Sequence, residues 1–272
     1  MKRIGVIGLL SISLVSCHQE AITEPWEVAM SRSITNNENV LVVGKKGNNE
    51  QLRGILIPSN DEGAAARWQG STPTWPGADL LDMYIISPAP ADGKLPQSIH
   101  VGDGTAWMVD YLPSAHKPNR FSLEHLLAKL QVHIRIDNDT ERMQPLDVKM
   151  TLHTEAEIDF PCKGLKNLSG KSNDNVYLGE FMKDASSNWV SAEVLILPQI
   201  LVHGEVCLRF RANGGEEYRF TPDTDLRFLA GKVNHLYLGI AFEQLELILI
   251  GNGTSITDWS YGDFQSGEAL EN

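Results

Sequence analysis

The sequence has few cysteines, few basic residues and only one long apolar run. Three of its 272 residues are cysteines, which is too few for a disulfide-rich scaffold or for a metal site built from cysteines. Lysine and arginine number 23 against 35 aspartate and glutamate residues, so the formal net charge is −12. Because binding to phosphates needs a basic surface, this balance argues against a nucleic-acid partner and against electrostatic attachment to anionic lipid.

The long apolar run lies at residues 4–15, directly after two basic residues. About a dozen apolar residues are too few to span roughly 30 Å of hydrocarbon as a helix, so the run predicts a secretory signal peptide. Beyond it, no stretch approaches the ~18 consecutive apolar residues of a membrane helix. The hydrophobic content of 42% and the charged content of 21% are ordinary for a globular protein.

The apolar run ends in Leu-Val-Ser-Cys at residues 14–17, which resembles a bacterial lipobox. In that resemblance residues 1–16 are a lipoprotein signal peptide that is removed, and Cys17 receives a diacylglyceryl thioether and an acylated (palmitate-type) amino group. Several acyl chains hold a protein stably on a bilayer. We therefore expect anchoring to the outer membrane through the lipid on Cys17, followed by a polar tether at residues 17–38.

Two further cysteines, Cys162 and Cys207, remain in the exported part. A disulfide is allowed there, and the sequence leaves open whether these two residues pair. Apolar and polar residues alternate over residues 205–211, which places Cys207 on the polar face of a strand.

Alternation of apolar and polar residues dominates the exported chain. The even positions from residue 126 to residue 136 are apolar, and the same pattern covers residues 148–152 and continues over residues 156–160. A strand places such residues on one face, whereas a helix would spread them around its circumference. Residues 123–130 have some helical character but lead into an alternating strand. Shorter strand candidates are residues 39–43, 54–57, 82–86, 106–112, 191–197, 217–221, 235–242 and 245–250.

Strands with one solvent-exposed face and one buried face are typical of antiparallel β-sandwiches. Residues 137–147 are polar, contain a proline and separate two strong strand candidates, so we interpret them as a domain boundary. The predicted fold is all-β, with two tandem antiparallel β-sandwiches of transthyretin-like type. The N-terminal sandwich is expected at residues 39–140 and the C-terminal one at residues 141–272.

Motifs of catalytic and metal sites are missing. The sequence contains no H-x-x-x-H, H-E-x-x-H, C-x-x-C or G-x-S-x-G pattern. The histidines that could serve as metal ligands or bases are His125, His133, His153, His203 and His235. Of these, His133 and His153 lie on the polar faces of alternating strands, where solvation explains them. We expect no enzyme activity, no cofactor and no metal.

Four aromatic residues are weighed for contact with a ligand: Trp68, Trp75, Trp107 and Tyr111. Aromatic side chains on loops can stack on sugars or anchor a partner, although packing in a core is their commoner role. Both roles stay open, and Trp68 and Trp75 are the possible ligand-contact aromatics.

Several segments, taken in order, resemble the fimbrillins, the pilin subunits of donor-strand pili in Gram-negative gut and oral anaerobes. The segments are residues 75–88 (WPGADLLDMYIISP), 110–136, 195–199 (LILPQ), 218–222 (YRFTP), 229–240 (LAGKVNHLYLGI) and 256–263 (ITDWSYGD). Their order and spacing, rather than any single segment, carry the resemblance over nearly all of the exported chain. The resemblance implies two antiparallel β-sandwiches in tandem, which the alternation predicts independently.

The resemblance also implies a route of assembly. A fimbrillin is exported as a lipoprotein, an Arg-directed protease removes an N-terminal segment with one strand, and a strand from the next subunit fills the apolar groove. Residues 39–47 match the removable strand, with Arg53 just beyond them as a possible cleavage site and Arg32 as the rival site. The donor strand is expected from about Ile256 onward.

We therefore expect a lipid-anchored, fimbrillin-like pilus subunit at the cell surface or in a fimbria, serving as shaft, tip or anchor and mediating adhesion. Its expected partners are other fimbrillin subunits and, beyond them, ligands on host or bacterial surfaces. The alternative is a stand-alone surface lipoprotein that binds glycan or host protein through its loop aromatics.

Overall fold

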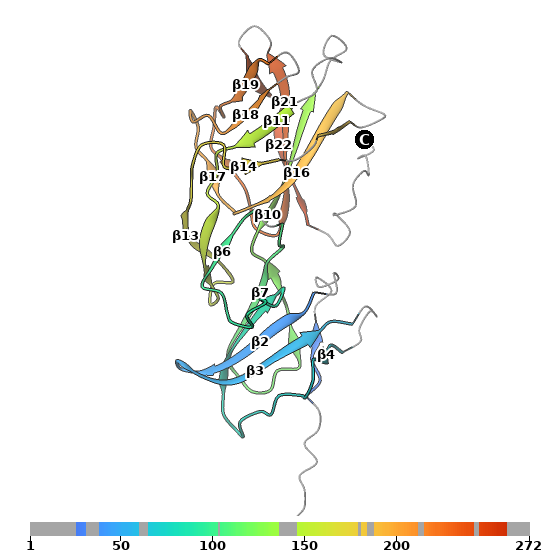
Figure 1. The fold of residues 1–272 in the computed structure, drawn as a ribbon, viewed down its shortest axis with the longest axis vertical. Helices are drawn as coiled ribbons and strands as arrows, with labels where there is room; N and C mark the ends of the chain where they lie inside the picture. The colour runs from blue at the N-terminus through green and yellow to red at the C-terminus, as the bar shows by residue number, and fades with distance from the viewer. Residues whose placement is uncertain are drawn as a thin grey trace, which may run out of the picture.

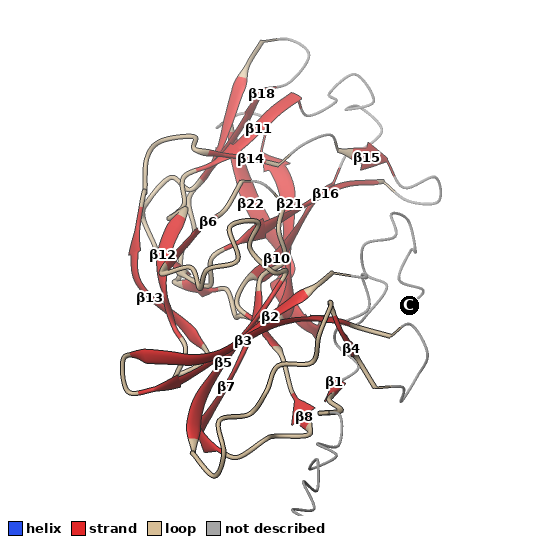
Figure 2. Cartoon of the chain, turned by 60° about the horizontal axis from the view of Figure 1, so that its bottom comes forward, coloured by secondary structure: helices blue, strands red, loops and turns tan. Residues whose placement is uncertain are grey.

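The computed structural model describes residues 26–30, 38–59, 65–102, 104–135, 146–178, 181–183, 188–211, 215–241 and 245–259. Within these residues every regular element is a strand and there is no helix (Figure 2). No helix able to cross a membrane occurs in this part of the chain. The all-β prediction is confirmed, and the segment at residues 123–130 contributes only short extended pieces.

A six-stranded antiparallel sheet forms the lower part of the elongated body in Figure 1, in the order β4-β3-β2-β5-β7-β9. Its strands are β2 (Val40–Lys46), β3 (Asn49–Ile57), β4 (Arg67–Trp68), β5 (Leu81–Ser87), β7 (Met108–Ala115) and β9 (Glu124–His125). Strand β2 lies inside the sheet, between β3 and β5, and its residues 40–43 have no exposed surface.

A nine-stranded sheet forms the upper part, in the order β14-β11-β18-β19-β22-β21-β10-β16-β15 (Figure 1). Its strands are β10 (Ala128–Arg135), β11 (Leu146–Met150), β14 (Val176–Tyr177), β15 (Met182–Lys183), β16 (Trp189–Ile196), β18 (Leu208–Arg211), β19 (Glu217–Phe220), β21 (Lys232–Ala241) and β22 (Glu246–Asp258). Strands from both ends of this order contribute to one buried apolar cluster. The sheet therefore folds over itself, and its two halves form the layers of a sandwich.

Three small sheets complete the described structure. The three-stranded sheet consists of β6 (Ser98–His100), β12 (Glu155–Asp159) and β13 (Gly164–Ser169). Two-stranded sheets join β1 (Ala29–Met30) to β8 (Arg120–Phe121) and β17 (Ile200–Leu201) to β20 (Leu226–Arg227). Apolar residues of β12 join a cluster with the six-stranded sheet, so the three-stranded sheet covers one face of that sheet.

The alternating run from residue 148 to residue 160 is not one strand, contrary to the prediction. It divides into β11, which belongs to the nine-stranded sheet, and β12, which belongs to the three-stranded sheet. Between them the backbone bonds to side-chain amides. Asn175 accepts from the N–H of Leu152 at 3.0 Å and donates to its carbonyl at 2.6 Å. Gln199 accepts from the N–H of the half-buried His153 at 2.9 Å. These amides replace the sheet ladder and let the chain change sheets.

The change from one large sheet to the other does not fall at residues 137–147. Strand β10, assigned from the sequence to the N-terminal sandwich, pairs with β16 and β21 of the C-terminal half over nearly its whole length. The sheets therefore change between β9 and β10, at residues 126–127. Residues 136–145, which contain most of the predicted boundary, lie outside the described part of the chain.

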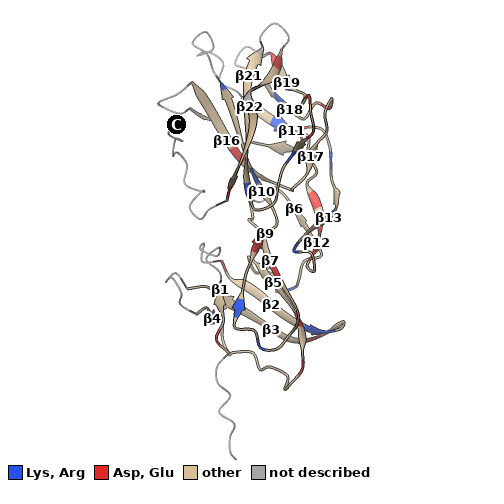
Figure 3. Ribbon diagram, turned by 180° about the vertical axis from the view of Figure 1, so that it is seen from behind, with Lys and Arg blue, Asp and Glu red and all other residues tan. Residues whose placement is uncertain are grey.

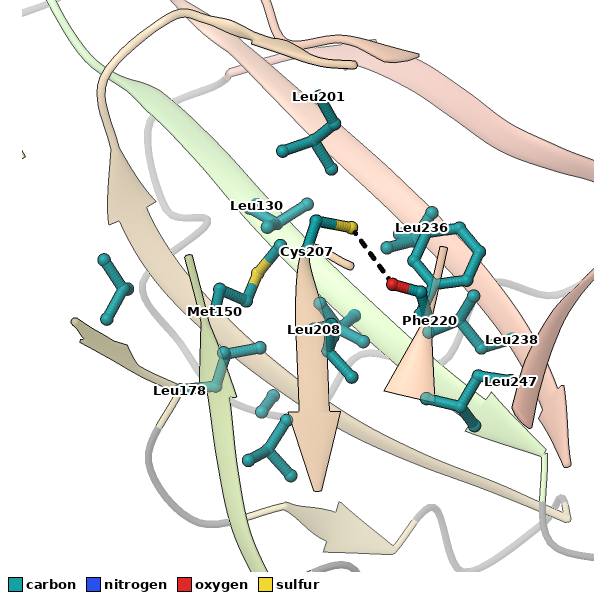
Figure 4. Close-up of a cluster of buried hydrophobic side chains, with 14 of the residues drawn as sticks. Leu130, Met150, Leu178, Leu201, Cys207, Leu208, Phe220, Leu236, Leu238 and Leu247 are labelled. Carbon is teal, nitrogen blue, oxygen red and sulfur yellow. Dashed lines mark hydrogen bonds between the residues drawn. The ribbon is translucent and has the colours of Figure 1, made fainter. Parts of the chain in front are cut away.

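Cys207 is buried, which corrects its predicted place on a polar face. Strand β18 begins only at Leu208, so the alternation does not extend back to Cys207, and both side chains enter the core (Figure 4). The thiol of Cys207 donates to the carbonyl of Phe220 at 3.6 Å. Cys162 is exposed, and neither cysteine forms a disulfide.

We predict that the two cysteines differ sharply in reactivity. Burial raises the pKa of the Cys207 thiol to about 12, so the reactive thiolate is scarce at neutral pH. In native protein lacking residues 1–17, iodoacetamide is expected to label Cys162 and to reach Cys207 only after denaturation. Peptide mass spectrometry with and without guanidinium checks this, and rapid native labelling of Cys207 would contradict the burial.

His133 is half-buried rather than solvated, again contrary to the prediction. Its ring lies 4.6 Å from the ring of Tyr237 at an interplanar angle of 11°. Its Nδ1 is 2.7 Å from Oγ of Ser191, and its Nε2 is 3.2 Å from Nδ1 of His235. Burial, together with the neighbouring His235, lowers the pKa of His133 to about 4. The polar face of this strand is thus crowded by its neighbours in the sheet.

The lowered pKa of His133 predicts a loss of stability in acid. The unfolded chain, with a histidine pKa near 6.5, binds this proton before the folded chain does, so the free energy of unfolding falls between about pH 6.5 and pH 4, by at most about 3 kcal/mol. His133→Phe keeps an aromatic ring against Tyr237 and is expected to flatten this part of the curve. Urea unfolding across the pH range measures it, with the exposed His116→Gln as the matched control; equal slopes in all three proteins would refute the assignment.

Candidate functional site

A short N-terminal segment, residues 26–30, docks against the six-stranded sheet region through its backbone. Strand β1 pairs in parallel with β8, and the N–H of Ala29 donates to the carbonyl of Asn119 at 2.8 Å. On the other side, the carbonyl of Val28 accepts from the N–H of Ala66 at 2.8 Å. The segment is therefore held as an added strand between two parts of the body that lie far from it in sequence.

Two side chains of this segment fill the core beneath it. Trp26 and Val28 are buried, with exposed fractions of 4% and 0%, whereas Glu27 and Ala29 between and beyond them are exposed. This alternation is what an extended strand with one buried face requires. The prediction that residues 17–38 form a polar tether is therefore corrected for residues 26–30, which are part of the packed structure.

Three tryptophans form an aromatic cluster at this segment. The ring of Trp26 lies 4.9 Å from that of Trp68 and 5.3 Å from that of Trp75, the latter in an edge-to-face arrangement. The indole N–H of Trp26 donates to the carbonyl of Pro118 at 2.7 Å, and that of Trp68 donates to the carbonyl of Trp26 at 2.8 Å. Because each buried indole N–H has a partner, the aromatic cluster carries no unsatisfied donor at these positions.

The packing of Trp68 beneath the N-terminal segment depends on a glycine in β3. A Cβ at Gly54 would lie 2.5 Å from the ring of Trp68 and 2.6 Å from Pro73, which is closer than side-chain atoms can approach. The missing side chain at Gly54 thus lets the Trp68 ring approach the strand closely. The Trp75 ring is held by a separate hydrogen bond, in which its indole N–H donates to the carbonyl of Asp79 at 3.0 Å.

This placement decides between the two roles considered for the tryptophans. Trp68 is only 7% exposed and packs in the core, so its ring has no surface to offer a ligand. Trp75 is half-buried and also contacts the ring of His116 at 5.8 Å. Of the two predicted ligand-contact aromatics, Trp68 is corrected to a core residue and Trp75 keeps a partly open surface.

The residues predicted for processing lie in different settings. Residues 40–46, which make up most of the strand predicted to be removable at residues 39–47, form β2, an interior strand between β3 and β5. Arg53 lies within β3, where its guanidinium is 2.6 Å from the carboxylate of Glu50. Cys17 and Arg32 lie outside the described residues.

The predicted donor segment begins inside β22. Ile256 pairs with Asn234 of β21 and is 49% exposed. On its other side β22 pairs with β19 only through Glu246 and Leu247. Within the described residues, the rest of that edge of β22 has no paired strand, so the strand presents backbone groups that another chain could pair with.

A model of the fimbrillin-like family matches residues 66–259. The chain belongs to this family. The fimbrillin-like family is one of fimbrial proteins rather than enzymes. No curated protein sequence matches this chain.

Three solved structures illustrate the fold of this fimbrillin-like chain. A putative cell adhesion protein from Bacteroides uniformis has a TM-score of 0.61 and 16% identity, covering 86% of this chain and 100% of that one. One from Bacteroides ovatus has a TM-score of 0.61 and 14% identity, covering 88% and 99%. A fimbrial protein from Bacteroides vulgatus has a TM-score of 0.50 and 10% identity, covering 83% and 94%. At these identities the likeness concerns the fold.

The burial of Trp26 predicts that this side chain holds the N-terminal segment in place. Trp26→Ala removes a large buried aromatic side chain and is expected to lower the free energy of unfolding by about 3–5 kcal/mol, or to release the segment if the rest of the body stays folded. Glu27→Ala, one residue away and exposed, should change it by less than about 0.5 kcal/mol. Urea unfolding measures both, and similar small effects would show that the packing contributes little.

Proposed function

We propose that this fimbrillin-like protein is a pilus subunit that joins its neighbour by strand exchange at the site now filled by residues 26–30. The observation that carries the proposal is the alternation of buried Trp26 and Val28 with exposed Glu27 in a segment bonded to the body on both sides. This is the pattern of a peptide added to a sheet, in which backbone bonds give affinity and alternate side chains give specificity.

Removal of this segment would open a groove without dismantling the sheets. Strand β1 contributes only two paired residues, and neither of the large sheets contains it. The groove would be lined by Trp68, Trp75 and Phe121, which share a buried cluster with Trp26. Exposed apolar surface of this kind is costly in water, so a strand from another subunit is stabilised there. While the resident segment stays in place, it covers the groove and delays association.

The structure supports Arg32 over Arg53 as the cleavage site in this proposal. Arg32 follows Met30, the last residue of β1, by two positions, so a cut there would separate the resident segment from the body and leave β2 intact. Arg53 pairs with Val43 of the interior strand β2, so a cut there would fall inside the sheet and detach β2. In the proposal the same cut also separates the body from the lipid anchor at Cys17.

The donor in this proposal is the C-terminal strand from about Ile256. Its support is the exposed side chain of Ile256 and the open edge of β22 described above. The alternative of a stand-alone glycan- or protein-binding lipoprotein is weaker, because Trp68 is buried and only Trp75 remains as a partly open loop aromatic.

Arg-specific protease treatment of the full-length protein tests the proposal. We predict a new N-terminus at Ser33, followed by multimers that dissociate on heating, because the freed groove accepts a strand from another copy. Arg32→Ala is expected to block both events, and Arg53→Ala neither. N-terminal sequencing and electrophoresis with and without boiling provide the measurements.

A peptide control connects the multimers to the groove. A synthetic peptide with the sequence of residues 25–30 (PWEVAM) should suppress multimers when it is present during cleavage, and the same peptide with alanine in place of tryptophan should not. Cleavage at Ser33 with no multimers, or multimers insensitive to the peptide, would count against strand exchange at this site.

A further inference from the structure

Three charged side chains meet where the six-stranded sheet contacts the turn between β12 and β13. Asp110 comes from β7, Glu124 from β9 and Lys163 from that turn. The Nζ of Lys163 lies 2.8 Å from Oδ1 of Asp110 and 3.2 Å from Oε1 of Glu124. In Figure 3, β9 and β12 lie where the lower and upper parts of the body adjoin. One amine therefore contacts two carboxylates across this junction.

The three groups are held in very different surroundings. The side chain of Asp110 is 1% exposed, that of Lys163 is 27% exposed and that of Glu124 is 58% exposed. Val109, which precedes Asp110, and Phe160, three residues before Lys163, belong to the apolar cluster between the sheets. Asp110 is thus buried, while Glu124 contacts the same amine from the solvent side.

Two backbone N–H groups fix the carboxyl group of Asp110. The N–H of Tyr111 donates to Oδ1 at 2.8 Å, and the N–H of Ser122 donates to Oδ2 at 2.7 Å. Donors fixed in this way stabilise negative charge that develops on a carbonyl oxygen during attack by a nucleophile. The amine, the carboxyl group and the two donors are therefore already arranged for an acyl-transfer reaction.

We propose that Lys163 and Asp110 condense to an isopeptide bond, with Glu124 as the proton carrier. The Nζ of Lys163 attacks Cγ of Asp110, a C–N bond forms, and one C–O bond of the carboxyl group breaks. Two of the three ammonium protons leave with that oxygen as water, and the third stays on the amide nitrogen. No electrons are exchanged and no further reactant is needed.

Glu124 supplies the proton transfers that the reaction requires. The hydrogen bond from Lys163 to Asp110 raises the pKa of the lysine, so the amine is charged at neutral pH and must lose a proton before it can attack. Glu124 can take that proton at 3.2 Å and return it to the departing oxygen of Asp110. Because the first transfer is uphill, we expect the bond to form slowly after folding.

The product would join two parts of the body covalently. Asp110 lies in the six-stranded sheet, whereas Lys163 belongs to the hairpin whose strand β12 pairs with β6. The crosslink would therefore fix the three-stranded sheet to the large sheet beneath it, in a chain whose described cysteines form no disulfide. This role does not depend on strand exchange, so its test is independent of the proposed function.

Intact-mass spectrometry of the folded protein without residues 1–17 tests the proposal. After prolonged incubation at neutral pH, the wild-type mass is expected to be lower than the sequence mass by one water molecule. Tryptic digestion should then give a branched peptide that joins the segment with Asp110 to the segment with Lys163. Lys163→Arg keeps the positive charge but cannot form the bond, and it should retain the full sequence mass.

Further variants separate the crosslink from other sources of water loss. Glu124→Gln should slow the loss of water at least about tenfold while the protein stays folded, since general acid–base catalysis contributes at least this much. A full sequence mass in folded wild-type protein after incubation would overturn the proposal and leave an ion pair. Water loss that persists in Lys163→Arg, for example by formation of a cyclic imide at Asp110, would also overturn the proposal. An unchanged rate of water loss in Glu124→Gln would show that Glu124 does not carry the proton.

Discussion

The burial of both faces of the six-stranded sheet is the constraint on which the rest of the described structure depends. In its interior strand, Val40 and Val42 enter the cluster that contains Trp26. Leu41 and Val43 enter a second cluster, which also holds apolar residues from the C-terminal half. A strand buried on both faces reads as a continuous apolar run, and for this reason β2 shows no alternation. The second cluster ties the two halves of the chain together although only residues 126–127 connect β9 to β10.

The sequence predicts where many of the strands lie, but it does not predict which strands pair with one another. The alternation in β10 is local and identified the strand, yet its pairing with β21 depends on residues far along the chain. The break after β11 depends on Asn175 and Gln199, whose side-chain amides bond to a backbone segment distant from both. Hydrophobic periodicity reports which residues are buried, whereas such long-range bonds decide which sheet buries them.

At the candidate site, too, the local sequence does not reveal which residues come into contact. The resemblance to fimbrillins implies a removable N-terminal strand, and it predicts that strand at residues 39–47. In the observed N-terminal segment, the apolar members of the pattern are Trp26, Val28 and Met30, which is too short a run for a periodicity to be recognised. That Trp68 is a core residue follows from its contacts with Trp26 and with Gly54, and neither contact is visible in the sequence around it.

In the proposed fibre, each contact joins a groove on one subunit to a strand of another, so the contact is heterologous and repetition gives an open chain. Tension then enters a subunit near β1 and leaves it near β22, and it must cross the junction between the six-stranded sheet and the C-terminal half. Apolar packing at that junction is non-directional and allows sliding. The contact between Lys163 and buried Asp110 is directional, because two backbone donors hold the carboxyl group in place. A fixed polar contact of this kind adds to the backbone pairing of β12 with β6, and together they oppose the sliding that the apolar cluster alone would permit.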